Sequence, residues 1–135
     1  MREDVERVFV YGTLRPPRPG VPADASRFYY RVAPYVERST AARLHGVVLY
    51  DAGAFPAARP GEGTIHGDLL IVTPPALALM DQIEGHPAFF HRTEVAAQTE
   101  AGPVTVWVYW APEELVAEKD SIPGGDWFEY IRKSR

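Results

Sequence analysis

The sequence contains no cysteine among its 135 residues. This absence excludes disulfides, thiolate catalysis and cysteine-based zinc sites, and it fits a reducing cytoplasm, where we expect the protein to reside. The chain also lacks a long hydrophobic run. Its first residues are charged and are followed by only a brief apolar stretch. We therefore expect neither a secretory signal nor a membrane span, which needs about 20 apolar residues.

A concentration of basic charge is missing as well. The chain has 14 Lys and Arg residues against 18 Asp and Glu residues, a formal net charge of -4, and both signs are interspersed. No basic stripe is available for a phosphate backbone or for anionic lipid, so we expect no nucleic-acid partner and no membrane partner. The length matches one domain of ordinary size, and we expect residues 1–135 to form a single domain. The sequence does not indicate an oligomeric state.

Familiar cofactor and metal motifs are also absent. The chain has no P-loop, no G-x-G-x-x-G and no G-x-S-x-G, so NTPase, dinucleotide-binding and serine hydrolase functions lack support. His45, His66, His86 and His91 show no metal-binding spacing. His66 and Asp68 share one strand face and are a minor candidate for a metal site. We expect no metal and no cofactor.

What the sequence does contain is a series of β-type apolar runs punctuated by 13 prolines and 11 glycines. Strands are predicted at residues 8–11, 42–50, 64–72, 91–98 and 104–110. The proline-rich segment after the first run, RPPRPG, cannot continue in a sheet because proline removes ladder donors, so it is predicted to be a loop. Residues 27–37 fit either a short helix or a strand, since their periodicity does not decide between the two.

One helical pattern stands out after the third predicted strand. Thr73 can cap a helix that begins with proline. Apolar residues then recur at intervals of three, at Leu77, Met80 and Ile83, and Gly85 is a natural terminator. Because strands outnumber helices, the fold class is predicted to be α+β with a curled or closed sheet. The pattern alone does not distinguish a barrel from an open sheet.

Glu84, at the end of this predicted helix, is in an unusual place for an anion. The terminal helix carbonyls disfavour another negative charge by a few tenths to about 1 kcal/mol, so a purely structural helix would prefer Lys or Arg there. One reading is a solvated surface glutamate. The other is a catalytic base, because the helix terminus and apolar neighbours such as Phe89 or Phe90 would raise its pKa.

A second conspicuous element is Tyr11-Gly12-Thr13-Leu14, which follows the first predicted strand. Gly12 lacks a Cβ, so the backbone can bend and a ligand can approach the exposed amide N–H groups closely. Such a loop can hold carboxylate or carbonyl oxygens. Tyr11 then either lines a pocket or is an ordinary core aromatic residue.

These elements together resemble the γ-glutamylcyclotransferase-like family, which includes γ-glutamylamine cyclotransferases and AIG2-like proteins. The resemblance rests on Tyr11 to Leu14, on the spacing of Asp81, Glu84, Phe90 and Arg92, and on Gly125-Asp126-Trp127 near the end. It implies a small mixed β-barrel flanked by helices. It also implies a cofactor-free reaction in which the α-amine of a γ-glutamyl amine or peptide attacks its own γ-carbonyl, giving 5-oxoproline and a free amine.

The resemblance also implies roles for individual residues. Glu84 would be the general acid and base, and the loop of Tyr11, Gly12, Thr13 and Leu14 would bind the oxyanion or the substrate carboxylate. Tyr109 would lie near the glutamate as a substrate-binding residue of the pocket, the alternative being ordinary packing within its strand. The family often has a tyrosine where this chain has Phe90, so a hydroxyl contact from that position is lost.

Two arginines and one rival function complete these expectations. We expect Arg92 to pair with Asp81 or Glu84, and Arg15 to be an exposed loop residue, although a bidentate contact with a carboxylate is open to it. The alternative function is a binding or regulatory module of the same fold that performs no reaction.

Overall fold

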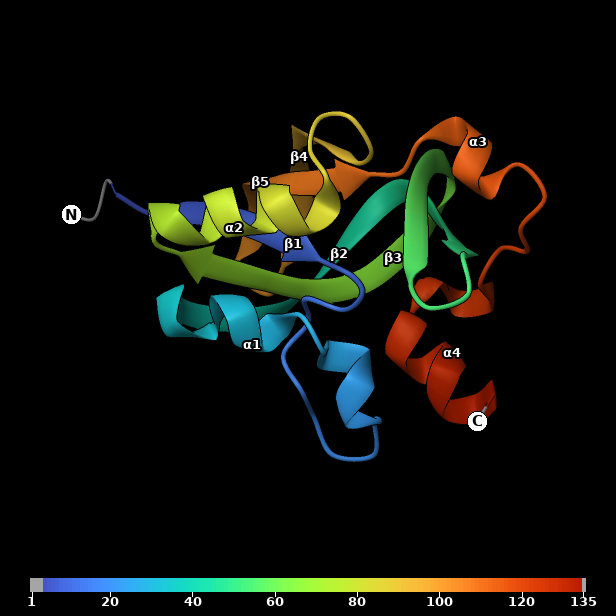
Figure 1. Cartoon of the computed structure of the whole chain (residues 1–135), viewed down its shortest axis with the longest axis horizontal. Coiled ribbons are helices and arrows are strands. Elements are labelled where there is room, and N and C mark those ends of the chain that lie inside the picture. Colours follow the sequence, from blue (N-terminus) through green and yellow to red (C-terminus); the bar gives the residue numbers. More distant parts are fainter. Residues whose placement is uncertain (1–3, 135) are drawn as a thin grey trace.

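The computed structural model describes residues 4–134, and its centre is a closed, mixed β-barrel (Figure 1). The strands are arranged in the order β1-β3-β2-β4-β5. The β1 and β5 strands pair in parallel, with Val8 opposite Trp107, and the other pairs are antiparallel. This confirms the α+β class and the small mixed barrel. The strand bounds are β1 (Glu6–Val10), β2 (Val36–Asp51), β3 (Pro56–Val72), β4 (His91–Thr99) and β5 (Gly102–Trp110).

The β2 and β3 strands are much longer than predicted, with 16 and 17 residues. The sequence prediction began them at residues 42 and 64, and it was wrong because the first part of β2 is mostly exposed and the first part of β3 contains Pro60 and two glycines, so neither part looks like a strand. Pro60 lies opposite Val47, next to a register shift at Gly46, whose φ is +79°. A bulge is one of the few places where a sheet tolerates proline. The ends of β2 and β3 at the turn that joins them therefore extend beyond the barrel and lie near α3 and α4 (Figure 1).

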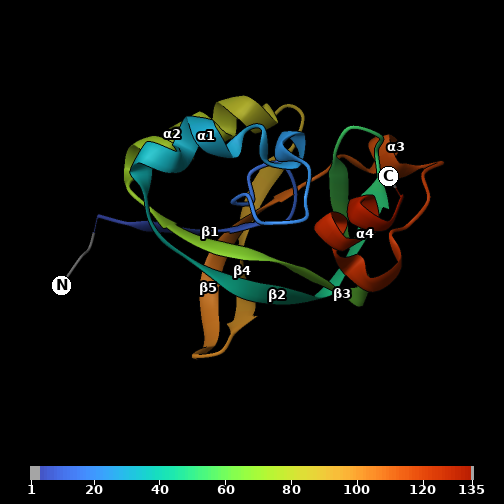
Figure 2. The same ribbon diagram turned by 90° about the horizontal axis from the view of Figure 1, so that it is seen from below.

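The undecided segment 27–37 contains short helical turns followed by the start of β2. The α1 helix (Tyr29–Val32) runs into a 3-10 turn at Ala33–Tyr35, and β2 begins directly afterwards. Figure 2 shows α1 beside α2 at one end of the barrel, while α3 (Glu113–Val116) and α4 (Trp127–Ser134) lie at the other end.

The α2 helix (Pro74–Glu84) confirms the predicted helix. Thr73 occupies its N-cap position, but its side chain makes no capping hydrogen bond. Gly85 ends the helix with a φ of +69°, and the His86 N–H donates to the Asp81 carbonyl oxygen at 2.9 Å. Because only glycine adopts this left-handed conformation freely, Gly85 determines where the helix stops, and so where Glu84 lies.

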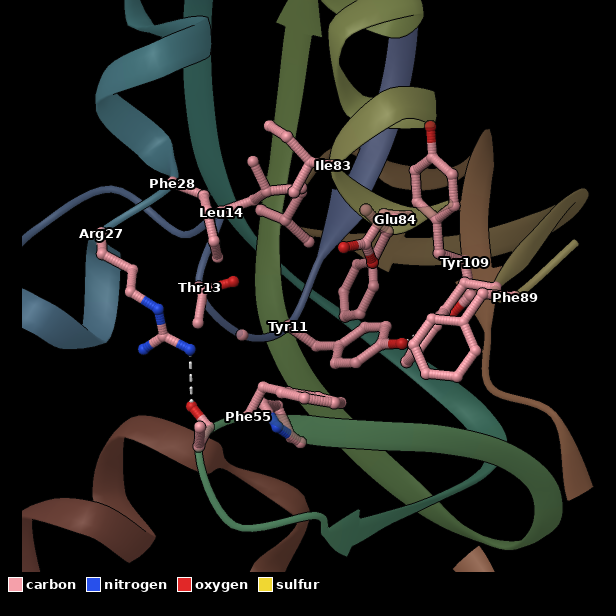
Figure 3. A pocket seen from close by; sticks show the side chains of 16 residues that line it. Tyr11, Thr13, Leu14, Arg27, Phe28, Phe55, Ile83, Glu84, Phe89 and Tyr109 are labelled. Atoms are coloured by element: carbon pink, nitrogen blue, oxygen red, sulfur yellow. Dashed lines mark hydrogen bonds between the residues drawn. The ribbon is translucent and has the colours of Figure 1, made fainter. Parts of the chain in front are cut away.

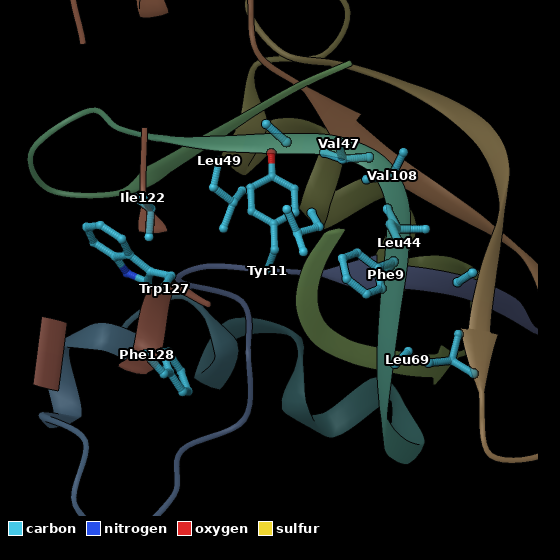
Figure 4. Packing of buried hydrophobic residues seen from close by; sticks show 14 of the residues in the cluster. Phe9, Tyr11, Leu44, Val47, Leu49, Leu69, Val108, Ile122, Trp127 and Phe128 are labelled. Carbon is cyan, nitrogen blue, oxygen red and sulfur yellow. The ribbon is translucent and has the colours of Figure 1, made fainter. Parts of the chain in front are cut away.

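Two hydrophobic clusters lie on the two faces of β1. Phe9 points into the barrel and packs in a cluster that reaches Trp127, Phe128 and Ile131 of α4 (Figure 4). Val8 and Val10 point the opposite way, as strand alternation requires, and belong to a second cluster together with Leu77 and Met80 of α2. The β1 strand is therefore packed on both faces, and this packing also fixes the position of its end.

No helix within residues 4–134 has the length and apolar character needed to cross a bilayer.

Candidate active site

A cavity of about 330 Å³ opens where β1 and α2 both end (Figure 3). Its walls come from the end of β1 and the following loop, the end of α2 and the chain after it, the turn before β3, and β5. The structure brings all the predicted site residues to this one cavity. The lining residues are Phe9, Val10, Tyr11, Gly12, Thr13, Leu14, Arg27, Phe28, Ala54, Phe55, Pro56, Ile83, Glu84, Phe89, Phe90 and Tyr109.

Glu84 projects into the cavity from the last turn of α2, with Tyr11 and Tyr109 beside it (Figure 3). Within the described range 4–134, no group donates a hydrogen bond to its carboxylate, and no cation pairs with it. Burial raises the pKa of Glu84 to about 7, because few water molecules can solvate the charged form. A carboxyl group with this pKa can both accept and return a proton near neutral pH.

Gly12 is needed for close packing and not for a left-handed turn. Its φ is not positive, but a Cβ at this position would lie only 2.7 Å from Cγ of Pro56. The carbonyl oxygens of Gly12 and Thr13 accept hydrogen bonds from the backbone N–H groups of Arg15, at 3.0 Å, and Phe28, at 3.2 Å. Pro56 and these two bonds together hold the loop in place.

The same loop leaves its own donors unused. Among residues 4–134, no acceptor receives a hydrogen bond from the N–H groups of Gly12, Thr13 or Leu14. Backbone N–H groups that border a cavity without a protein partner are available to oxygen atoms of a ligand.

Tyr11 and Tyr109 are joined in a hydrogen-bonded chain. The Tyr11 hydroxyl donates to the Tyr109 carbonyl oxygen at 2.6 Å, and the Tyr109 hydroxyl donates to Oδ1 of Asp81 at 2.5 Å. Burial raises the pKa of both phenols, so both remain protonated donors. Tyr11 is thus both a core residue and a cavity residue, because its buried ring borders the open space.

Arg92 pairs with Asp81 and leaves Glu84 without a cation. Its Nε and Nη2 donate to the two Asp81 oxygens at 2.8 and 3.0 Å, and its guanidinium lies 4.3 Å from the Trp107 ring centre. Burial alone would raise the pKa of Asp81, but the hydrogen bonds from Arg92 and Tyr109 outweigh it and lower that pKa. Two carboxyl groups three residues apart therefore have pKa values shifted in opposite directions, which suits them to different tasks.

The expectation for Arg15 is wrong. Only 3% of its side chain is exposed, its Nε donates to Asp68 at 2.8 Å, and its Nη1 donates to Asp126 at 3.0 Å. Arg18 also reaches Asp68, at 2.9 Å, and both guanidinium groups lie over the Phe128 ring. The buried Asp68 and the half-exposed Asp126 hold Arg15 in the interior, an effect that depends on segments far apart in the sequence.

The idea of a metal at His66 and Asp68 fails for a related reason. Asp68 is buried and occupied by two arginines, whereas His66 is exposed. Within the part of the chain that the structure describes, no three His, Asp or Glu side chains form a group that could hold a metal ion.

Some lining residues were not anticipated from the sequence. Arg27 borders the cavity opposite Glu84 (Figure 3), next to Phe28, and Ala54 and Phe55 contribute the turn before β3. The signal available in the sequence was the turn at residues 51–56, which contains a glycine and a proline. No local pattern marks Arg27, because its place at the cavity depends on the fold of the whole loop.

Comparison with known proteins identifies the family of this chain. The family model for gamma-glutamyl cyclotransferase, AIG2-like, matches residues 8–129. The gamma-glutamylcyclotransferase family protein ytfP of Citrobacter rodentium is 28% identical over 123 residues, which cover 91% of this chain and 96% of that protein.

Solved structures show the same fold. The solution structure of ytfP from Escherichia coli superposes with a TM-score of 0.58 at 27% identity, covering 91% of this chain and 96% of that one. The crystal structure of an AIG2-like protein from Mus musculus gives a TM-score of 0.66 at 20% identity, covering 87% and 86%. The chain therefore belongs to the AIG2-like gamma-glutamyl cyclotransferase family.

Proposed function

We propose that this member of the family is an active γ-glutamyl cyclotransferase that converts a γ-glutamyl amine or peptide to 5-oxoproline and a free amine. The observation that carries the proposal is that Glu84, half-buried and without a partner among the described residues, shares one cavity with the unused N–H groups of Gly12, Thr13 and Leu14. A proton acceptor and a set of fixed dipoles are the two things that this cyclisation requires.

In the proposed reaction Glu84 first removes a proton from the substrate's α-ammonium group. The freed α-amine attacks the γ-carbonyl carbon of the same molecule, and a new C–N bond closes the five-membered ring. Because both reacting groups belong to one substrate, the protein needs only to hold the glutamyl chain in a folded, near-attack geometry. The apolar walls formed by Phe9, Phe55 and Phe90 exclude water from the folded glutamyl chain of the substrate.

The attack places negative charge on the former carbonyl oxygen. We assign stabilisation of this oxyanion, or of the substrate carboxylate, to the N–H groups of the Gly12 to Leu14 loop, whose position is fixed before the reaction. Collapse of the intermediate breaks the original amide C–N bond. Glu84 then returns its proton to the departing amine, and the positively charged ring nitrogen gives up its second proton to the released amine, which leaves as an ammonium group, so that Glu84 ends in its starting state.

Tyr109 has a positioning role in this proposal. Its hydroxyl is committed to Asp81 and its carbonyl oxygen to Tyr11, so it holds the Tyr11 ring against the cavity beside Glu84. The pairing of Asp81 with Arg92 also keeps this cation away from Glu84, and so preserves the raised pKa on which the proton transfers depend. A cytoplasmic location goes with the proposal, since a chain without cysteine forms none of the disulfides that are common in secreted proteins.

The test is a product assay. The purified protein is incubated with γ-glutamyl-alanine and with γ-glutamyl-ε-lysine, and 5-oxoproline is measured against an enzyme-free control that corrects for spontaneous cyclisation. We expect 5-oxoproline and the free amine in equal amounts from at least one substrate. A folded protein that forms no 5-oxoproline but binds these compounds in calorimetry would contradict the proposal and indicate a binding module.

A further inference from the structure

The segment Gly125-Asp126-Trp127, which the proposed reaction does not use, lies at the start of α4. Gly125 packs so closely on β3 that a Cβ at this position would collide with the Thr64 carbonyl oxygen. Trp127 is buried in the hydrophobic cluster inside the barrel (Figure 4). The Asp126 side chain between these two residues is therefore held at a fixed place relative to the barrel.

Asp126 holds two groups with one oxygen atom. Its Oδ1 accepts the Glu129 N–H at 3.3 Å, a contact that caps the first turn of α4. The same oxygen accepts Nη1 of Arg15 at 3.0 Å, and this contact joins segments that are 111 residues apart in the chain. Asp126 therefore connects α4 to the segment that follows β1.

Arg15 closes the loop that borders the cavity. It follows Leu14 directly, and its backbone N–H donates to the Gly12 carbonyl oxygen at 3.0 Å. This bond closes a tight turn with Thr13 and Leu14 at its centre. Because the turn is short, the place at which Arg15 is held determines the direction of the backbone N–H groups before it.

The Arg15 guanidinium is buried and anchored from two sides. Its Nε donates to Asp68 of β3 at 2.8 Å, and Asp68 lies opposite Val10, the last residue of β1. Asp126 and the Phe128 ring, whose centre lies 4.3 Å from the guanidinium carbon, hold the group from α4. A guanidinium is planar with rigid donors, so two contacts in different directions fix its orientation, whereas one contact would let it turn.

We propose that Arg15 and Asp126 are positioning residues, through which α4 aims the N–H groups of Gly12, Thr13 and Leu14 at the substrate. This inference rests on the proposed function, in which these N–H groups bind the oxyanion or the substrate carboxylate. Within the described range 4–134, neither Arg15 nor Asp126 lines the cavity, so both act through the loop and touch no substrate. The direction of fixed donors matters, because a small misplacement weakens the hydrogen bonds that stabilise the transition state.

Two substitutions of Asp126 separate its two contacts. Serine and asparagine both cap helices, so Asp126→Ser and Asp126→Asn should keep α4. Asparagine has the length of aspartate and can still accept a hydrogen bond from Arg15, whereas serine is too short to reach it. The assay measures 5-oxoproline formation from whichever γ-glutamyl compound of the product assay gives the higher rate.

We expect kcat/KM to fall by about 10-fold in Asp126→Ser and by about 2-fold or less in Asp126→Asn. The first loss is smaller than the roughly 10²- to 10³-fold cost of removing an oxyanion donor, because the N–H groups stay in the loop and only their direction changes. A loss in kcat would assign the loop to the oxyanion, and a loss in KM would assign it to the substrate carboxylate. Both results support positioning.

Glu129→Gln is the matched control on α4. It removes the pairing with Arg132 but leaves the backbone N–H that Asp126 accepts, so kcat/KM should match that of the wild type. Circular dichroism verifies that each variant is folded at the assay temperature. Wild-type kcat/KM in Asp126→Ser, or equal losses in Asp126→Ser and Asp126→Asn, would overturn the inference while 5-oxoproline formation still supported the proposed function.

A second variant and a second measurement keep the test independent of these results. Arg15→Lys retains the charge but lacks the planar fork, so kcat/KM should fall by about 10-fold in this variant as well, even if Asp126→Ser does not fold. An unchanged kcat/KM in folded Arg15→Lys would overturn the inference.

Amide relaxation in NMR tests the loop without turnover, and so decides the matter even if no substrate gives 5-oxoproline. We expect order parameters of about 0.85 for Gly12, Thr13 and Leu14 in the wild type and in Asp126→Asn, and values nearer to about 0.6 in Asp126→Ser or Arg15→Lys. Unchanged order parameters and amide chemical shifts in the last two variants would overturn the positioning role.

Discussion

Asp68 and Glu84 are two carboxyl groups removed from bulk water on either side of the loop that follows β1, and they have opposite surroundings. Asp68 receives Arg15 at 2.8 Å and Arg18 at 2.9 Å. Glu84 has no partner within residues 4–134, and its pKa is raised to about 7. A buried charge that is fully paired serves the structure, whereas one left unpaired is held ready to exchange a proton. Under the proposed function, the Glu84 side of the loop takes part in the reaction, and the Asp68 side anchors the loop.

The largest expected effect is on turnover, when the unpaired carboxyl group is changed. Glu84→Gln keeps the size of the side chain but cannot accept a proton, so we expect kcat to fall by about 10²- to 10⁴-fold. The measurement is 5-oxoproline formation at saturating substrate, with circular dichroism to verify the fold. Glu118→Gln, an exposed glutamate outside the cavity, is the control and should retain the full rate. A rate for Glu84→Gln within threefold of wild type would remove Glu84 from the mechanism.

The paired carboxyl group should affect stability instead. Asp68→Asn leaves the buried Arg15 guanidinium with only the half-exposed Asp126 as a counter-charge, and we expect a loss of about 3 kcal/mol in the free energy of unfolding, measured by urea denaturation. The Arg18 side chain is 41% exposed and is the outer partner of Asp68. Arg18→Gln removes this partner and should lower the free energy of unfolding by about 1 kcal/mol or less. Similar losses in both variants would show that the buried pair has no special weight.

The two carboxyl groups should also differ in the pH dependence of stability. The pKa of Glu84 is about 7 in the folded protein and about 4.3 in an unfolded chain, so the folded state binds the extra proton between these values. Wild-type stability should therefore fall as the pH rises from about 4.3 to 7, by about 4 kcal/mol, and stay low above pH 7. Glu84→Gln lacks this loss. Its stability relative to wild type should rise by that amount between pH 4 and pH 8, and parallel curves would contradict the raised pKa.

The smallest expected effect concerns Tyr109, which links Asp81 to the cavity. Tyr109→Phe removes the 2.5 Å hydrogen bond to Asp81, and we expect a loss of about 1 kcal/mol in stability together with a several-fold fall in kcat/KM. Tyr130→Phe is a matched control, because the Tyr130 hydroxyl also donates to an aspartate, Asp51, but lies outside the cavity. It should leave turnover unchanged. Unchanged turnover in Tyr109→Phe as well would limit Tyr109 to a structural role.

Much of the local structure could be predicted from short patterns. The spacing of Leu77, Met80 and Ile83, with Gly85 after them, located α2 and so the end that carries Glu84. The apolar run before Gly12 located β1, although the strand ends at Val10 and not at Tyr11. These features depend on neighbours within a few residues, and such neighbours are visible in the sequence. The α4 helix was overlooked, although Trp127, Phe128 and Ile131 follow helical spacing behind Asp126, whose side chain accepts the Glu129 N–H at 3.3 Å.

The amino-acid sequence by itself determined the helix end at Gly85, the apolar faces of the strands and the presence of a carboxyl group in an unfavourable place, because each depends on local conformational preference. Only the tertiary structure decided that the sheet closes, that Arg15 is buried against Asp68 and Asp126, and that Arg27 lies opposite Glu84. The physical reason is distance along the chain. Whether a charge is paired, and how far it is removed from water, depends on residues that only folding brings together.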